Sequence, residues 1–184
     1  MTRGLTQLLL ALTVIVLCSC ADTDDWISRR YPGRRFFFFY EEHPTSLLFA
    51  AYKSPGMYVY VYTKINHGVR HVYVQSNDAR MLPEDNAITT ERESRAPYFV
   101  GANSEIGIIV GCSFFNGALA FDRICPNCSG YQPLAWAENA QHVKCAKCKR
   151  TYDLGTGAIV DGEKGEVLMR YGIAFDGTKL YVGN

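Results

Sequence analysis

The chain lacks an excess of charge of either sign, and it lacks any long run of apolar residues. Its 184 residues include 19 lysines and arginines against 18 aspartates and glutamates, a formal net charge of +1. Binding to a phosphate backbone needs a basic face, so this balance gives no support for a nucleic-acid partner. No apolar stretch reaches the roughly 18 residues of an ordinary membrane-spanning helix. The length and the 48% hydrophobic content fit one globular domain, which we expect to be monomeric.

The motifs of common catalytic sites are also missing. The chain has no glycine-rich phosphate-binding loop and no His-Glu-x-x-His zinc motif. The residues that could form a Ser-His-Asp triad show no typical order or spacing in the sequence, although a triad is assembled in space. These residues are Ser113, Ser129, His142, Asp122 and Asp153. The sequence therefore predicts no catalytic residues, and an enzyme is the least supported class.

The first twenty residues follow the order of an export signal. A weakly positive start precedes the apolar run LLLALTVIVL (8–17), which is too short to span a bilayer, and small residues follow it. The end of this segment resembles a bacterial lipobox, with Leu17 and Ser19 before the cleavage point and Cys20 directly after it. The resemblance implies that residues 1–19 are a lipoprotein signal peptide and that Cys20 is lipidated. A plain secretory peptide that is cut nearby is the alternative.

Acidic and polar residues follow Cys20. Residues 20–30 lack periodicity and include Asp22, Asp24 and Asp25, so we expect a flexible tether. The lipid would hold the protein at the cell envelope, and we expect the membrane to be the outer membrane. The acidic residues resemble the tether with which some Gram-negative bacteria send lipoproteins to the cell surface. A membrane, bound through the lipid, is the partner that this segment predicts.

The remainder, residues 31–184, consists of short strand-like runs separated by turns. The aromatic block RRFFFFYEE (34–42) predicts a buried strand, residues 43–56 a brief helix, and residues 77–97 a loop with at most one helical turn. Glycine-bearing turns between β-rich runs predict three hairpins, at 66–68, 116–117 and 176–177. Short strands with regularly recurring turns indicate an all-β barrel or sandwich.

The seven cysteines fall into distinct groups. Cys18 leaves with the signal, Cys20 takes the lipid, and Cys112 lies in an apolar segment where a buried free thiol is expected. The other four form two Cys-x-x-Cys pairs with 16 residues between them: Cys125, Cys128, Cys145 and Cys148. Each tight turn points two sulfurs at one centre, and two facing turns supply four thiolates in a tetrahedron. The interval fits the zinc-site pattern of about 15–20 residues between pairs.

Charged and aromatic residues surround the two pairs. Positive charge beside the second pair favours deprotonated thiols, and it comes from Lys144, Lys147 and Lys149. Asp122-Arg123 and Lys149-Arg150 are expected to pair and brace the loops, with a docking patch as the alternative. Three residues between the pairs are expected to cover the site: Tyr131, Pro133 and Trp136.

The cysteine region resembles the cluster-binding part of Rieske proteins. The motifs FDRICPNC, VKCAKCKRTYDLGTG and GEVLMRY carry the resemblance, which covers residues 106–184 well and the earlier strands loosely. In that family, loops of the form C-x-H and C-x-x-H hold a 2Fe–2S cluster. Cys125 and Cys145 match the two cysteines of those loops, and YDLGTG (152–157) matches the segment after the second loop. A group of secreted bacterial lipoproteins that shares CPNC and C-x-x-C-K-R is more similar still. The resemblance implies a Rieske-like β-sandwich with a small, zinc-ribbon-like metal-binding subdomain at about residues 121–157.

The chain departs from the Rieske pattern at both histidine ligands. Asn127 stands at the position of the first histidine, and Cys148 stands at the second. None of the chain's histidines falls on a ligand position: His43, His67, His71 and His142. Ligation by two histidines and two cysteines, which raises the potential of Rieske centres, is therefore not available from these loops. The resemblance thus implies the fold and leaves the cofactor open.

Three arrangements of the four cysteines remain open. A structural zinc ion fits the spacing and needs no assembly machinery, which makes it the leading prediction. An iron centre, either 2Fe–2S or mononuclear, would make an electron-transfer protein, but an exported chain needs a route to receive a cluster. Two disulfides would suit an oxidising compartment. We therefore expect an exported, Rieske-like lipoprotein with a binding or structural role, and keep electron transfer as the alternative.

Overall fold

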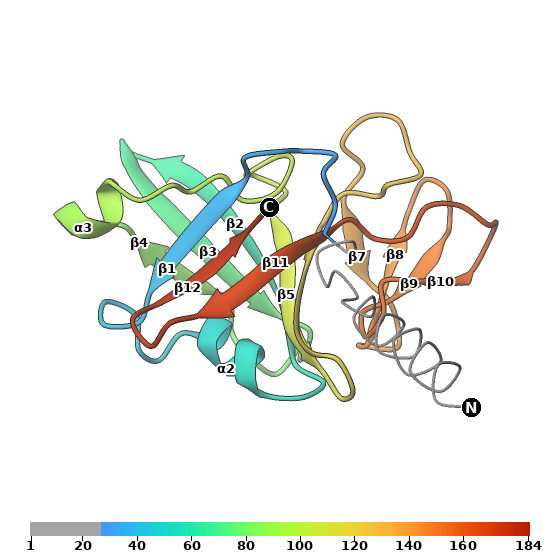
Figure 1. Cartoon of the computed structure of the whole chain (residues 1–184), viewed down its shortest axis with the longest axis horizontal. Coiled ribbons are helices and arrows are strands. Elements are labelled where there is room, and N and C mark those ends of the chain that lie inside the picture. Colours follow the sequence, from blue (N-terminus) through green and yellow to red (C-terminus); the bar gives the residue numbers. More distant parts are fainter. Residues whose placement is uncertain (1–26) are drawn as a thin grey trace, which may run out of the picture.

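The computed structural model describes residues 27–184. The predicted signal peptide, Cys20 and the first part of the predicted tether lie outside the described residues. Within the described part, short strands dominate and the two helices are brief (Figure 1). The prediction of an all-β protein is confirmed. No helix of residues 27–184 has the length and apolar character needed to cross a membrane.

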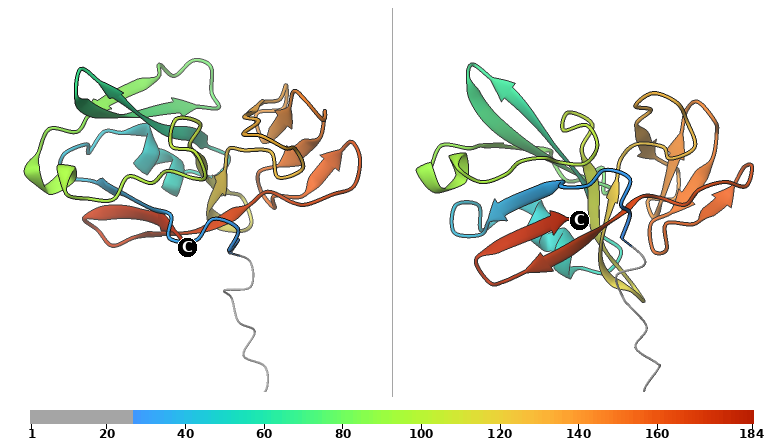
Figure 2. Two further views of the ribbon diagram at one scale, coloured as in Figure 1. Left: turned by 90° about the horizontal axis from the view of Figure 1, so that it is seen from above. Right: turned by 45° about the horizontal axis from the view of Figure 1, so that its top comes forward.

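Eight strands form one antiparallel sheet that curls around a core (Figures 1 and 2). The three predicted hairpins are confirmed, because each joins two neighbouring strands of this sheet. The order across the sheet is β1 (Arg35–Phe39), β12 (Lys179–Gly183), β11 (Arg170–Phe175), β6 (Gly117–Asp122), β5 (Ile108–Ser113), β2 (Tyr58–Asn66), β3 (Val69–Ser76) and β4 (Glu84–Ala87).

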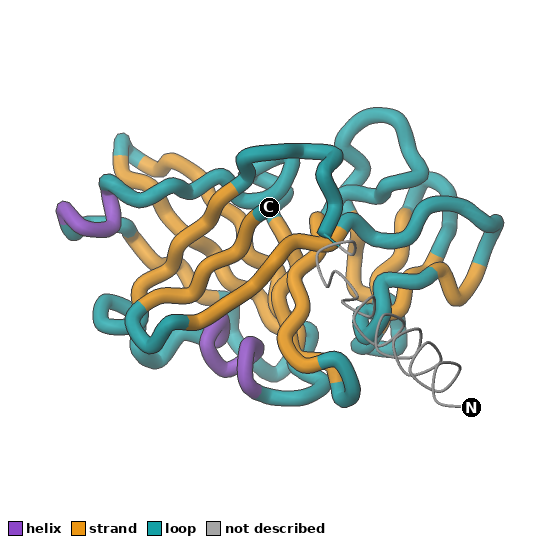
Figure 3. The backbone as a smooth tube through the Cα atoms, in the orientation of Figure 1, coloured by secondary structure: helices purple, strands orange, loops and turns teal. Residues whose placement is uncertain are grey.

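Four shorter strands form a second antiparallel sheet at one end of the molecule (Figure 3). Their order is β10 (Ile159–Asp161), β9 (Thr151–Asp153), β8 (His142–Cys145) and β7 (Leu134–Trp136). Strands β7, β8 and β9 lie within the predicted metal-binding subdomain of about residues 121–157, and β10 follows directly after it.

The two helices were predicted from the sequence, whereas strand β4 was not. α2 (Leu47–Lys53) is the predicted brief helix, and the Ser46 side chain caps it by accepting a hydrogen bond from the backbone N–H of Leu48. α3 (Glu91–Ser94) is the expected helical turn. Strand β4 was not predicted, because the first three of its residues EDNA are polar and show no alternation with apolar residues. Pairing with β3 makes this segment a strand.

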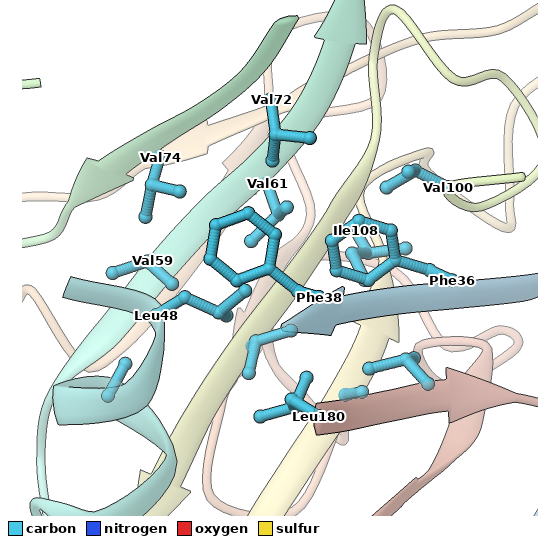
Figure 4. Packing of buried hydrophobic residues seen from close by; sticks show 14 of the residues in the cluster. Phe36, Phe38, Leu48, Val59, Val61, Val72, Val74, Val100, Ile108 and Leu180 are labelled. Atoms are coloured by element: carbon cyan, nitrogen blue, oxygen red, sulfur yellow. The ribbon is translucent and has the colours of Figure 1, made fainter. Parts of the chain in front are cut away.

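The main core fills the inside of the curled sheet. Phe36 and Phe38 of β1 point inward and lie close to Val59 and Val61 of β2 (Figure 4). These four side chains are all buried, and α2 adds Leu48 to the same core. The aromatic block of β1 is thus a buried strand, as predicted.

The central strands of the large sheet are buried on both faces. Side chains of a strand alternate between its faces, so Val59 and Val61 enter the main core while Tyr58 and Tyr60 enter a second one. β5 and β6 divide their side chains in the same way. The second core lies between the large and small sheets and includes Cys125 and Cys145. The cysteine region therefore packs on the outer face of the large sheet.

The described part of the predicted tether is docked on the domain. The backbone N–H of Ser28 donates to the carbonyl of Arg170 at 2.8 Å, and the Asn184 amide donates to the carbonyl of Ser28 at 2.7 Å. Arg30 donates to the carbonyl of Pro126 at 3.2 Å. Residues 27–30 therefore belong to the folded domain, although the sequence assigned them to the tether.

Candidate metal centre

The two Cys-x-x-Cys turns are positioned by strands of both sheets. The first turn follows β6, and the backbone N–H of Cys125 donates to the carbonyl of Gln132 at 2.9 Å. The second turn begins at Cys145, the last residue of β8, and leads into β9. It is closed by the N–H of Lys149, which donates to the carbonyl of Cys145 at 3.0 Å, and Lys149 adopts a φ of 64°. Both turns therefore face each other at the end of the small sheet.

The four predicted ligands lie together in space. Their sulfur atoms are all within 4.8 Å of one another. The Sγ atoms of Cys125 and Cys148 are 3.6 Å apart, and those of Cys128 and Cys145 are 3.8 Å apart. Four sulfurs bound at about 2.3 Å around one ion would stand about 3.8 Å from each other in a tetrahedron. The arrangement could therefore hold a metal ion.

The cluster is half inside the protein. Cys125 and Cys145 are fully buried in the second core, while Cys128 and Cys148 are partly exposed at its edge. All four are free thiols in the structure, as is the buried Cys112, which lies outside the cluster as predicted. The inner pair thus joins the site to the core, and the outer pair closes it on the solvent side.

The protonation of the thiols differs with their surroundings. Burial raises the pKa of Cys125 to about 12, although a hydrogen bond with Tyr152 opposes the shift. Burial likewise raises the pKa of Cys128. Burial also opposes the charged form of Cys148, but hydrogen bonds from the backbone and guanidinium of Arg150 outweigh it and lower the pKa to about 6. The thiolate of Cys148 is therefore favoured by the backbone N–H of Arg150 and, after it, by the Arg150 guanidinium.

Tyr152 and Asn127 form a layer of hydrogen bonds behind the cluster. The hydroxyl of Tyr152 lies 3.4 Å from the sulfur of Cys125. The Asn127 amide donates to this hydroxyl at 2.9 Å and to the carbonyl of Glu166 at 2.6 Å, and its oxygen accepts from the backbone N–H of Glu166 at 2.8 Å. Asn127, which the predicted resemblance matches to a histidine ligand, is thus bonded to a distant loop. Sequence spacing held no signal for this contact, because Asn127 and Glu166 are 39 residues apart.

Arg150 and Arg30 hold the same loop from two sides. The guanidinium of Arg150 donates to the carbonyls of Glu163 and Lys164 at 2.9 and 3.2 Å, and it pairs with the Glu163 carboxylate at 3.1 Å. Arg30 pairs with the Glu166 carboxylate at 2.9 Å. Loop residues 163–166 are thereby fastened over the side of the cluster.

Asp122 and Arg123 brace the first turn, but not through the expected pairing with each other. Asp122 is fully buried and accepts hydrogen bonds from the Tyr171 hydroxyl and the Ala102 N–H at 2.7 Å, and from the Ile124 N–H at 2.9 Å. Burial raises its pKa, and these hydrogen bonds oppose the shift. Asp122 therefore fixes the backbone where the chain leaves the large sheet for the cysteine turn.

Arg123 braces the region through an aromatic stack. Its guanidinium carbon lies 3.8 Å from the ring centre of Tyr60, and Trp136 stacks parallel to the same ring at 3.7 Å. One face of the Tyr60 ring cannot contact both the Arg123 guanidinium and the Trp136 ring, so Tyr60 lies between Arg123 and Trp136. The Arg123 Nε also donates to the carbonyl of Leu134 at 3.1 Å. This stack joins the large sheet to β7 of the small sheet.

Of the residues predicted to cover the site, Tyr131 lies beside the cluster and is 56% exposed. It borders a cavity of about 270 Å³ that is also lined by Cys128 and Arg30. Pro133 forms an isolated bridge to Ile124. Trp136 packs against the second core, which contains Cys125 and Cys145.

The histidines and the candidate triad residues take other roles. No histidine of the described chain is part of the cysteine cluster. His142 lies 3.6 Å from the carboxylate of Asp153. The hydroxyl of Ser113 accepts hydrogen bonds from the backbone N–H groups of Phe115 and Asn116. These contacts tie turns together rather than assemble a nucleophile with a base.

The comparisons with known proteins give no relative. No family model, no curated protein and no solved structure matches this chain. The Rieske resemblance therefore stays a prediction, and the chemistry of the site rests on its own geometry.

Proposed function

We propose that the protein is an exported, lipid-anchored protein in which the four cysteines hold one zinc ion with a structural role. The observation that carries this proposal is the convergence of all four sulfurs within 4.8 Å, from two facing turns. Four thiolates around one ion are the ligand set and geometry of a closed structural zinc site. Such a site leaves no open position for a substrate.

The structural role follows from the size of the small sheet. Its strands contain three, four, three and three residues, which is too little for a sheet that is stable by itself. Two of the sulfurs belong to the core that this sheet shares with the large one. A bound ion would cross-link β6, β8 and the turns between them, and its binding energy would stabilise the fold.

The compactness of the cluster favours a single ion over a 2Fe–2S centre. In a cluster held by four cysteines each iron takes two of them, so the two irons and their bridging sulfides would separate the pairs. The described histidines are absent from the site, so the mixed ligand set of Rieske centres is not available. Two disulfides would need sulfurs at about 2.05 Å, whereas the two nearest pairs stand at 3.6 and 3.8 Å. Zinc is the ion that fits these thiols without a redox role.

The proposed location comes from the start of the sequence. The short apolar run, the lipobox-like residues and Cys20 support lipidation after export. The lipid would hold the domain at a membrane of the cell envelope, with the outer membrane as the proposed site. Mass spectrometry of the mature amino terminus tests this step, because a lipidated Cys20 adds the mass of acyl chains to the first residue.

Metal analysis of purified protein tests the function directly. We expect a colourless protein with one zinc ion per chain. Cys128→Ser should release the metal and lower the melting temperature, because three thiolates close the site poorly. Cys112→Ser is the matched control, since this buried thiol lies outside the cluster and should leave the zinc in place.

A coloured sample would contradict the proposal of a zinc site. A brown protein whose visible absorption bleaches on reduction would indicate iron and an electron-transfer role. Full zinc content in Cys128→Ser would contradict the four-cysteine site.

A further inference from the structure

Two adjacent phenylalanines lie exposed at the tip of the β5–β6 hairpin. Phe115 is 96% exposed and Phe114 is 65% exposed. The tip extends beyond the body of the large sheet, at the lower edge of Figure 1. The two adjacent rings together form a small exposed apolar patch on a projecting turn, and an exposed apolar patch can serve as a contact site.

The tip is held in a fixed shape. The Ser113 hydroxyl accepts hydrogen bonds from the N–H groups of Phe115 and Asn116, each at 3.2 Å. The Asn116 side chain donates to the carbonyl of Gly155 at 2.8 Å and so joins the tip to the small subdomain. The Phe114 ring lies against Gly56, where a Cβ would come within 2.7 Å of it. The two rings are therefore presented by a rigid turn, which keeps the ordering cost of an insertion low.

The hairpin lies beside the point where the described chain begins. Ile27 and Asn116 line one groove of about 560 Å³, together with Gly155 and Tyr171. Six residues lie between Cys20 and Ile27, and the seven Cα–Cα steps that join these two positions span at most about 25 Å. A lipid on Cys20 would therefore keep Ile27, and with it the groove that it shares with Asn116, within about 25 Å of the bilayer surface.

We propose that Phe114 and Phe115 insert into the boundary between headgroups and acyl chains of the bilayer that holds the lipid anchor. This inference rests on the proposed lipidation of Cys20. Aromatic rings suit that boundary, where their apolar faces leave water without entering the middle of the membrane. Because the anchor already holds the domain at the surface, a weak insertion is sufficient to orient it.

A lipid surface fits this tip better than a second copy of the chain. A stable protein interface buries about 800 Å² on each partner, which is far more than two side chains on a turn can offer. Insertion into lipid needs no matching partner surface and gains from each ring separately. The tip has the small size and the projection that insertion requires.

Depth-dependent quenching in vesicles tests the inference with the lipidated, metal-containing protein. The background is Trp26→Phe/Trp136→Phe, which removes both native tryptophans, and it carries one of two probes, Phe115→Trp or Ile65→Trp. Ile65 is the matched control, because it is also apolar and 70% exposed but lies at the other end of the sheet, near the β2–β3 turn. Tyr58, at the start of β2, pairs with β5 near Ser113, and Ile65 lies about 23 Å further along β2. Lipids brominated near the headgroup should quench the probe at 115 several-fold more than the probe at 65.

The possible outcomes distinguish insertion of the hairpin from binding through the lipid anchor alone. Protein that floats with the vesicles while the probe at 115 stays unquenched would overturn the insertion and leave the anchor in place. Protein that does not float would overturn both. Light scattering in detergent measures the oligomeric state of the parent protein and of the double variant Phe114→Ser/Phe115→Ser. The double variant should keep its zinc. If the parent protein is a dimer and the double variant is a monomer, the tip serves self-association, and this result would also overturn the inference.

Discussion

Asn127 lies beside the cysteine cluster, yet its amide is bonded to the Tyr152 hydroxyl and to the backbone of Glu166. A Cβ on Gly165 would come within 2.2 Å of the Asn127 oxygen, so the loop packs closely on this side chain. From the sequence alone, a histidine at 127 would be a harmless change in a turn. The structure predicts otherwise, because an imidazole cannot replace the paired donor and acceptor in this space.

We expect Asn127→His to lower the free energy of unfolding by about 1 kcal/mol, because it removes hydrogen bonds to the hydroxyl of the buried Tyr152 and to the exposed backbone of Glu166. The zinc content should stay unchanged, since Asn127 is not a ligand. Urea denaturation and elemental analysis measure the two effects. Ser129→Ala, at an exposed position in the next turn, is the control. A histidine variant that is as stable as the parent would show that the loop contact contributes nothing.

Asp122 is a buried carboxyl that depends on Tyr171. The pKa of Asp122 is raised by burial, so the folded state binds its proton more tightly than the unfolded chain does. Its charge therefore costs stability at neutral pH, and this cost disappears as the pH falls through the folded pKa. The Tyr171 hydroxyl reduces the cost by donating to the carboxylate at 2.7 Å.

Tyr171→Phe should destabilise the protein by about 1–3 kcal/mol at pH 7, because it removes one donor from a buried charge. It should also raise the pKa of Asp122 further, so the difference from the parent protein should shrink towards pH 4. Urea titrations at the two pH values measure this. Tyr181→Phe on the neighbouring β12 controls for the loss of a hydroxyl. An equal difference at both pH values would contradict the assigned role of Asp122.

The elements of the two sheets are joined by the stack of Arg123, Tyr60 and Trp136. Because Trp136 belongs to β7 and Tyr60 to β2, the stack carries the contact between the small and large sheets. The ring of Tyr60 is buried and Trp136 is half-buried. The position of the metal turns relative to the large sheet depends on this contact.

Trp136→Ala should lower the free energy of unfolding by about 1–3 kcal/mol, somewhat less than for a fully buried aromatic residue. Hydrogen exchange should rise first in β7 and β8, since these strands would be held less firmly on β2. Exchange in β3 should change little. Trp136→Phe keeps a ring for the stack and should recover most of the loss. Uniform exchange changes in both sheets would show that the stack is not a local joint.

Across the whole molecule, the two cores differ in their dependence on the cluster. The main core lies inside the curled sheet and contains none of the four cysteines, whereas the second core includes Cys125 and Cys145. Removal of the proposed zinc should therefore unfold the small sheet and leave β2 and β3 protected, because the main core stays intact. Local unfolding of this kind is common where a metal replaces apolar contacts.

Treatment with a chelator followed by hydrogen exchange tests this division. The amides of β8 and β9 should exchange rapidly in the stripped protein, and added zinc should restore their protection. Cooperative loss of protection in both sheets would contradict it and would make the domain one metal-dependent unit. Unchanged exchange in β8 would show that the ion does not hold the small sheet.

Local sequence patterns determined much of this protein. Three glycine-bearing turns between β-rich runs predicted the hairpins of the large sheet, because turn geometry depends on a few adjacent residues. The two Cys-x-x-Cys pairs predicted the members of the cluster for the same reason, since each pair needs only a tight turn. Both kinds of signal lie within stretches of four to ten residues.

Only the tertiary structure decided what surrounds these local features. The hydrogen bonds from Asn127 to Glu166 and from Tyr171 to Asp122 join residues 39 and 49 positions apart. Strand β4 exists because β3 lies next to it, and residues 27–30 are docked because they meet β11 and the cysteine turn. Such contacts depend on the order of strands in the sheets. That order is set by the packing of two cores on opposite faces of β2, β5 and β6, and no short segment encodes it.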